Sequence, residues 1–288
     1  MFRTIFVAIA ALAGGAAVAH AQTSITIPAD PVPIVNAEIN GRPVRLEVDL
    51  RFPSGLALSG ASSERLRVRR LPLVGVRVGV DGGASLRGRV ARPRIEFGDE
   101  ASRAWTAVFQ APVTTRADGV IGPGALPHDI VTVTLGPEPA AARDIVFTLE
   151  DADVWIGETQ VGGETMRVSF DLAHGDSVFN RTAARHLDAS GAIVSNGELA
   201  ERHLILGLRT LMQPVRTELT VERLSLGPTF ARTNSPLLGA DEADAIVVQA
   251  EAENAAPAAV MLGRDALAGC SSISVNRQTR RMTLRCAG

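Results

Sequence analysis

Two stretches of this chain follow one pattern. Residues 40–50 read NGRPVRLEVDL, and residues 162–172 read GGETMRVSFDL. Each begins with a turn signal containing glycine, continues as a strand in which apolar and polar residues alternate, and ends in Asp-Leu. Similar short strands and turns fill most of the remaining chain, so the sequence predicts a mainly β protein.

Further features follow the two stretches in the same order. Each copy continues with a short helix, an element of two apolar residues and Gly, and two final strands. The helices are expected at 61–66 and 182–187, the apolar elements at Val120-Ile121-Gly122 and Met261-Leu262-Gly263, and the final strands at 130–135, 145–149, 273–276 and 282–285. This order predicts an internal duplication, with one copy at 22–149 and the other at 152–288. The second copy is longer, and the acidic stretch 241–257 is expected to be a solvated insertion.

Asp49 and Asp171 occupy the same place in the two copies. If a pseudo-twofold axis brings them together, two carboxylates share one site, in which only one ionises easily. The ionised member can then activate a water while the protonated member donates to a carbonyl oxygen. Alternatively, each Asp caps a turn or the following helix. Their matching positions favour the paired site.

With these features the chain resembles the retropepsin-like and pepsin-like aspartic peptidases. Their repeat runs from an apolar strand into Asp-Thr/Ser-Gly, then through a short helix, a flap hairpin and an apolar-apolar-Gly element. The resemblance implies a two-lobed β-barrel fold, Asp49 and Asp171 as catalytic pair, and a substrate-binding flap at Asp81, Gly82 and Gly83. It also implies an exported endopeptidase that hydrolyses peptide or protein substrates with a held water, without cofactor or metal.

Both Asp motifs depart from the family pattern. Leu50 and Leu172 stand where a Thr or Ser follows the Asp, and Arg51 and Ala173 stand where Gly comes next. A fixed positive charge on Arg51 near the pair would favour two ionised carboxylates. A second hypothesis is therefore a catalytically silent homologue that binds peptide or a protein partner in the inter-lobe cleft. A third is a structural periplasmic module whose acidic loop mediates interaction.

The first 21 residues have the pattern of a secretory signal peptide. Arg3 precedes an apolar run at 5–18, and Ala19-His20-Ala21 fits the site of signal peptidase. The run is shorter than the roughly 20 residues that span a bilayer, which disfavours a membrane anchor. We expect a periplasmic or secreted protein with no stable membrane span after cleavage.

Cys270 and Cys286 are the two cysteines of the chain. In an oxidising compartment a disulfide between them is favoured over two free thiols or a catalytic thiol. They have no paired spacing, and the histidines of the mature chain are scattered, so no metal site is predicted.

All 29 basic residues are Arg, and Tyr is absent. The lack of Lys excludes Schiff-base chemistry and the lysine-containing phosphate loop. The net charge of -2, without a basic block, argues against a nucleic acid partner. The pepsin branch typically carries a tyrosine on its flap, and this chain has none.

Overall fold

The computed structural model describes residues 22–52, 54–79, 85–232 and 256–288. The expected signal peptide at 1–21 and the expected flap turn at Asp81, Gly82 and Gly83 lie outside these residues. So does the acidic stretch at 241–257, apart from its last two positions.

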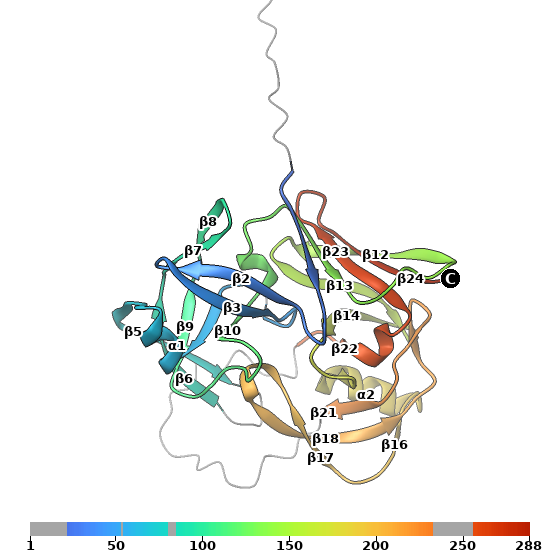
Figure 1. Cartoon of the computed structure of the whole chain (residues 1–288). Coiled ribbons are helices and arrows are strands. Elements are labelled where there is room, and N and C mark those ends of the chain that lie inside the picture. The colour runs from blue at the N-terminus through green and yellow to red at the C-terminus, as the bar shows by residue number, and fades with distance from the viewer. Residues whose placement is uncertain (1–21, 53, 80–84, 233–255) are drawn as a thin grey trace, which may run out of the picture.

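The chain is mainly β, as the sequence predicts (Figure 1). The N-terminal half, residues 22–151, contains β1 (Ser24–Pro28), β2 (Ile34–Ile39), β3 (Arg42–Val48), β4 (Leu56–Ser59), α1 (Gly60–Arg65), β5 (Arg70–Gly79), β6 (Ser85–Ala91), β7 (Arg94–Phe97), β8 (Glu100–Arg103), β9 (Thr106–Phe109), β10 (Gly119–Ile121), η1 (Pro123–Ala125), β11 (Ile130–Thr134) and β12 (Ala142–Asp151). Both β2 and β3 lie where alternation in the sequence places them, and α1 lies within a residue of the expected helix.

The C-terminal half, residues 152–288, repeats much of this order. It contains β13 (Val154–Val161), β14 (Glu164–Asp171), β15 (Ser177–Phe179), α2 (Arg181–Ala189), β16 (Val194–Ser195), β17 (Ala200–His203), η2 (Ile205–Gly207), β18 (Arg209–Arg216), β19 (Thr220–Val221), β20 (Leu224–Ser225), β21 (Thr229–Arg232), β22 (Ala259–Gly263), η4 (Arg264–Leu267), β23 (Cys270–Asn276) and β24 (Arg281–Ala287). The predicted second helix and the predicted final strands are confirmed.

The strand that precedes Asp49 and the strand that ends in Asp171 have corresponding neighbours. β3 pairs with β2 antiparallel and with β10 parallel, and β10 pairs with β4 antiparallel. In the other half, β14 pairs with β13 antiparallel and with β22 parallel, and β22 pairs with β15 antiparallel. The next strands continue the correspondence, since β4 pairs with β9 and β15 pairs with β21, both parallel. Each aspartate therefore lies at the end of a strand that has a hydrogen-bonded neighbour on both sides.

Local sequence explains these hairpins and helices. The β2–β3 turn places Asn40 and Gly41 at φ 53° and 69°, the left-handed conformation that a tight hairpin turn requires and that Asn-Gly adopts readily. Ser59 is the N-cap of α1, and its side chain accepts a hydrogen bond from the N–H of Ser62. Asn180 caps α2 in the same way through the N–H of Ala183.

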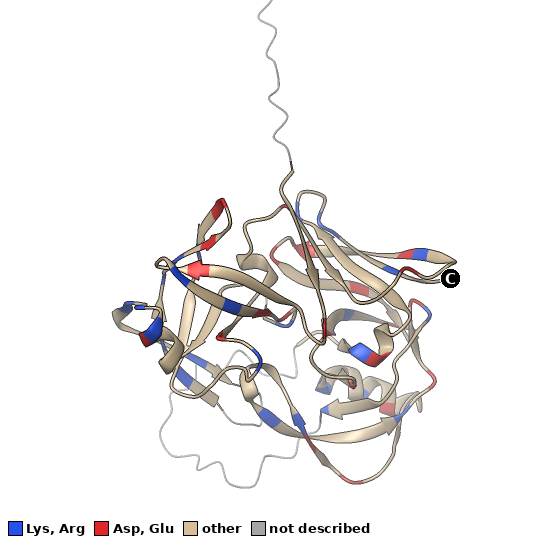
Figure 2. Ribbon diagram, in the orientation of Figure 1, with Lys and Arg blue, Asp and Glu red and all other residues tan. Residues whose placement is uncertain are grey.

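A continuous sheet and one apolar core join the two halves. The sheet runs in the order β1-β11-β23-β24-β12-β13-β14, so that β11 of the N-terminal half pairs with β23 of the C-terminal half. The largest cluster of buried apolar side chains likewise draws on both halves. Charged residues of both signs are scattered over both halves (Figure 2). Within the described residues, no helix has the length and apolar character needed to cross a bilayer.

A disulfide joins Cys270 to Cys286 across the neighbouring strands β23 and β24. The two cysteines are separated by 16 positions, and both are buried. The bridge thus ties the last strand of the chain to the sheet that joins the halves.

Replacing both cysteines by Ser is expected to lower the free energy of unfolding by about 3 kcal/mol, since the bridge closes a loop of this length in the unfolded chain. Urea unfolding of the oxidised wild type, the reduced wild type and the double variant measures this loss. The reduced wild type should match the double variant, and equal stability of all three proteins would contradict the prediction.

Candidate functional site

Asp49 and Asp171 meet through the guanidinium of Arg51. The Nη2 of Arg51 donates to Oδ2 of Asp49 at 2.7 Å, and its Nε donates to Oδ1 of the same carboxylate at 2.9 Å. Its Nη1 donates to Oδ2 of Asp171, also at 2.7 Å. Nε and Nη2 thus form a bidentate pair with Asp49, and Nη1 binds Asp171 of the other half.

Asp49 and Asp171 are buried, and Arg51 between them is only slightly more exposed. The side chains of Arg51, Asp49 and Asp171 are 10%, 8% and 2% exposed. Removing such charges from water costs several kcal/mol each, which is offset only by close pairing and further hydrogen bonds. The geometry supplies both, so the three residues are an interdependent Asp–Arg–Asp centre.

The strand pairings set the position of each carboxylate. Asp49 directly follows β3, and its N–H donates to the carbonyl of Ile121 at the end of β10. Asp171 ends β14, where it pairs with Gly263 of β22. A Cβ on Gly263 would lie 2.1 Å from the carbonyl oxygen of Gly175, so only Gly allows the chain after Asp171 to approach this closely. On the other side, the N–H of Gly122 donates to the carbonyl of Gly55.

Backbone groups and a histidine complete the shell around Asp171. Its Oδ1 accepts from the N–H of Ala173 at 2.8 Å and from that of His174 at 3.2 Å. The Nδ1 of His174 lies 2.8 Å from Oδ2 of Asp171. Because an ionised carboxylate only accepts hydrogen bonds, Nδ1 must carry the proton of this pair. The ring of His174 stacks on that of His203, with centroids 6.2 Å apart.

These contacts fix the ionisation of the centre. Burial by itself would raise the pKa of Asp171, but the hydrogen bond from His174 and the charge of Arg51 together hold that pKa below its ordinary value. Burial would lower the pKa of Arg51, whereas its contacts with Asp49 and the charge of Asp171 raise it well above the ordinary value. The guanidinium therefore stays charged, and Asp171 is ionised at neutral pH.

Leu50 and Leu172 point into the core. They are 3% and 4% exposed and belong to the same apolar cluster. At these two positions, apolar packing takes the place of the hydroxyl groups that the resemblance would supply. Ala173 contributes only its N–H to Asp171.

Sequence reasoning brought together Asp49, Asp171 and Arg51 but did not assign a role to His174 or His203. For His174 a signal was present, since it lies three positions after Asp171 in the same turn. His203 had none, because its place beside His174 depends on the path of β17. Within the described part of the chain, no three His, Cys, Asp or Glu side chains gather in a group able to hold a metal ion.

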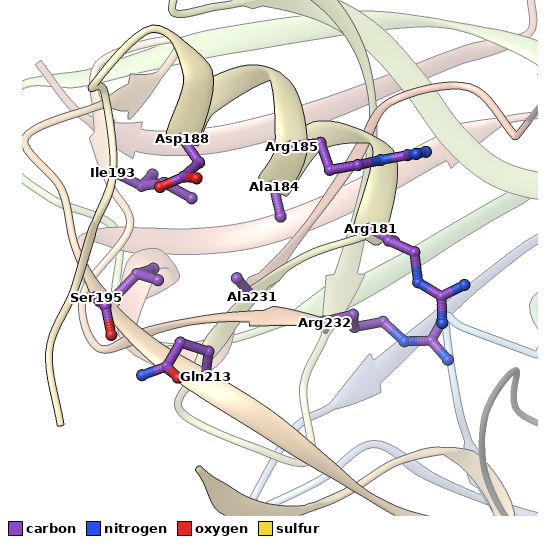
Figure 3. Close-up of a pocket in the computed structure, with 10 residues that line it drawn as sticks. Arg181, Ala184, Arg185, Asp188, Ile193, Ser195, Gln213, Ala231 and Arg232 are labelled. Atoms are coloured by element: carbon purple, nitrogen blue, oxygen red, sulfur yellow. The ribbon is translucent and has the colours of Figure 1, made fainter. Parts of the chain in front are cut away.

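A pocket of about 220 Å³ lies away from this centre, between α2 and the strands β16, β18 and β21 (Figure 3). Arg181, Arg185 and Arg232 stand at one side of it, and each has an interaction partner. The pocket includes none of the residues that hold the two aspartates. It therefore offers no route to the Asp–Arg–Asp centre.

Comparison with known proteins gave no assignment. No protein-family model and no curated protein matches this chain.

Acid is expected to weaken the fold through Asp171. Because its folded pKa is depressed, its contribution to stability is fully present above the ordinary value of 3.8 and is lost as the pH falls from there through the folded pKa. Urea unfolding at a series of pH values below about 6 measures this loss. Asp171→Asn should flatten the acid limb, whereas Asp99→Asn, on the exposed β7–β8 turn, should leave it unchanged. Equal acid limbs in all three proteins would refute this assignment.

Arg51→Met is expected to lower the free energy of unfolding at pH 7 by about 3–5 kcal/mol, because it leaves two buried carboxylates facing each other without a cation. Part of this loss should be recovered as the pH is lowered, because two carboxylates that share a site without a cation cannot both ionise easily. The matched control is Arg94→Met, which removes an exposed pair with Glu96 and should cost less than about 1 kcal/mol. A loss at Arg51 no larger than at Arg94 would mean that the centre is not interdependent.

Proposed function

We propose that this protein is a catalytically silent relative of the aspartic peptidases that binds an extended segment of a peptide or partner protein between two lobes. The single observation that carries the proposal is the guanidinium of Arg51, bonded to both Asp49 and Asp171.

This contact opposes peptide hydrolysis in two ways. An Asp pair of the peptidase type works by sharing one proton, so that one member activates water and the other donates. In this arrangement both carboxylates accept hydrogen bonds from Arg51, so neither is placed to donate a proton. It also engages an oxygen of each carboxylate, which competes with a water for the same acceptors.

The strand pairings support the aspartic-peptidase type of fold and the internal duplication. The parallel pairing of β3 with β10 and of β14 with β22 brings each Asp beside an apolar-apolar-Gly element. The antiparallel and parallel pairings around them recur in the same order in both halves. Two copies of one supersecondary unit account for this recurrence more simply than two unrelated halves.

An extended ligand agrees with the edge of the N-terminal sheet. β5 is the terminal strand in the order of the nine-stranded sheet, next to β6. A terminal strand offers backbone N–H and C=O groups to an added strand, and side chains on alternate positions then select the ligand. The hairpin of β5 and β6 is also the one whose turn was expected to be the flap.

The second candidate function is that of an exported aspartic endopeptidase with Asp49 and Asp171 as the catalytic pair. The corresponding positions of the two aspartates favour it. It requires Arg51 to leave both carboxylates before a water can bind between them, which exposes two charges that are buried in this structure.

We propose an exported location for either function. The signal-like pattern of residues 1–21 and the bond between Cys270 and Cys286 both support an oxidising compartment such as the periplasm.

The two candidates are separated by cleavage and binding assays with a library of blocked hexapeptides between about pH 3 and 7, the range in which carboxyl groups titrate. We expect no cleavage by the wild type, and binding of a subset of peptides that is retained by Asp49→Ala when the variant is folded. Mass spectrometry follows cleavage, and fluorescence anisotropy follows binding. Wild-type cleavage that disappears in both Asp49→Ala and Asp171→Ala would establish the peptidase instead.

A further inference from the structure

The turn between β17 and β18 carries part of the C-terminal half into the N-terminal half. In Figure 1 this hairpin, drawn in orange, reaches toward the green loop that joins β9 to β10. A Cβ placed on Gly207 at the tip would lie 3.9 Å from the carbonyl oxygen of Pro112 in that loop. The tip therefore contacts a surface that its own half does not provide.

Leu206 is the residue that enters this surface. Its side chain is 4% exposed and packs in one apolar cluster with Ala57, Phe109, Val113 and Val120. All four partners belong to the N-terminal half, on β4, β9, β10 and the loop between the last two. Leu206 is thus the one fully buried member that the other half gives to this cluster, and the partly buried Ile205 of the same turn packs against it.

The same hairpin covers a corresponding apolar cluster of its own half. Leu204 packs against the cluster of Val178, Met212 and Phe230. The guanidinium of Arg202 lies 4.0 Å from the ring centroid of Phe230. One hairpin therefore covers an apolar surface on each half of the molecule.

These two surfaces adjoin the Asp–Arg–Asp centre. His203, next to Leu204, stacks on His174, which is bonded to Asp171. In the N-terminal half, Phe52 directly follows Arg51 and packs with the cluster around Leu206. The hairpin thus adjoins the centre through His203, and the cluster that it enters adjoins the centre through Phe52.

The backbone at Leu206 is unusual for this residue type. Leu206 has φ 56° and ψ 31°, and Gly207 follows with φ 74°. Gly and Asn adopt this left-handed conformation readily, whereas the Cβ of Leu makes it unfavourable. Burial of the Leu206 side chain against the N-terminal half offsets this backbone cost.

We propose that Leu206 is a built-in occupant of an apolar binding pocket formed by Ala57, Phe109, Val113 and Val120. The ligand that competes with it is an extended peptide presenting one large aliphatic or aromatic side chain, and binding requires the β17–β18 hairpin to withdraw. This inference rests on the proposed peptide-binding function, and adds to it the position of the specificity pocket and the segment that regulates access.

The side chain of Leu206 indicates which ligand groups fit the pocket. A leucine side chain fills it with no polar partner, and all four walls are apolar. A ligand must open the hairpin before it binds, so its apparent dissociation constant is the intrinsic constant divided by the open fraction. Removing the side chain of Leu206 should therefore tighten binding and expose the pocket.

Leu206→Gly is the test variant, because it keeps the left-handed turn and removes only the side chain. Leu206→Asn is the second variant, with a residue that also tolerates this backbone. The matched control is Arg223→Gly, because Arg223 has φ 73° but is exposed, on the β19–β20 turn away from the proposed binding edge. Thermal unfolding and circular dichroism first establish that each full-length protein is folded.

Two probes are then used on each protein. The dye 8-anilinonaphthalene-1-sulfonate reports apolar surface without any peptide. A fluorescein-labelled hexapeptide with a central Leu, compared with the same peptide carrying Ser, reports the pocket's ligand by fluorescence anisotropy. Both Leu206 variants should gain dye fluorescence and bind the Leu peptide about tenfold more tightly or better. The Ser peptide should change less, and Arg223→Gly should behave as the wild type does.

The outcomes separate this inference from the proposed function. If wild type and folded Leu206 variants bind the Leu peptide equally, with no gain of dye, the occlusion by Leu206 is refuted while peptide binding stands. If the variants gain dye but no protein binds either peptide, a peptide is not the ligand, and both proposals are overturned. A tenfold gain that is equal for the Leu and Ser peptides would refute the apolar specificity of the pocket.

Discussion

The guanidinium of Arg51 between two buried carboxylates is the contact on which the rest of this molecule depends. Asp49 and Arg51 come from one half of the chain and Asp171 from the other, so the ion pairs also join the halves. Leaving any member without its partners would place an uncompensated charge in the interior. The surrounding backbone is fitted to this centre, with N–H groups of Arg51, Ala173 and His174 directed at the carboxylates.

The Asp–Arg–Asp centre and the β17–β18 hairpin both make contacts between the two halves. The cation donates to both carboxylates, and the hairpin packs against an apolar cluster of each half. Leu50 and Leu172 pack in one apolar cluster. Their burial stabilises the loops that follow Asp49 and Asp171 by apolar packing, without hydrogen bonds between hydroxyl groups. These contacts support the proposal of a scaffold that holds a ligand.

Most of the secondary structure could be predicted from the sequence because it is set locally. Alternating apolar residues fixed the faces of β2 and β3, and Asn40-Gly41 fixed the turn between them. The caps of the two helices were not assigned in advance, although Ser59 and Asn180 are residue types that favour that role. The length of β12 was underestimated, since its ends depend on the strand that pairs with it.

The sequence by itself determined that the protein is mainly β, that two aspartates follow equivalent strands, and that an arginine stands near one of them. It determined no more, because residues 49 and 171 are brought together only by long-range strand pairing, which local patterns do not encode. The tertiary structure alone decided that Arg51 points between the carboxylates rather than toward solvent. It also decided that Leu206 packs against the opposite half, since a single leucine in a turn carries no signal of its distant partners. The physical reason is the same in both cases: burial and charge pairing are properties of the assembled fold.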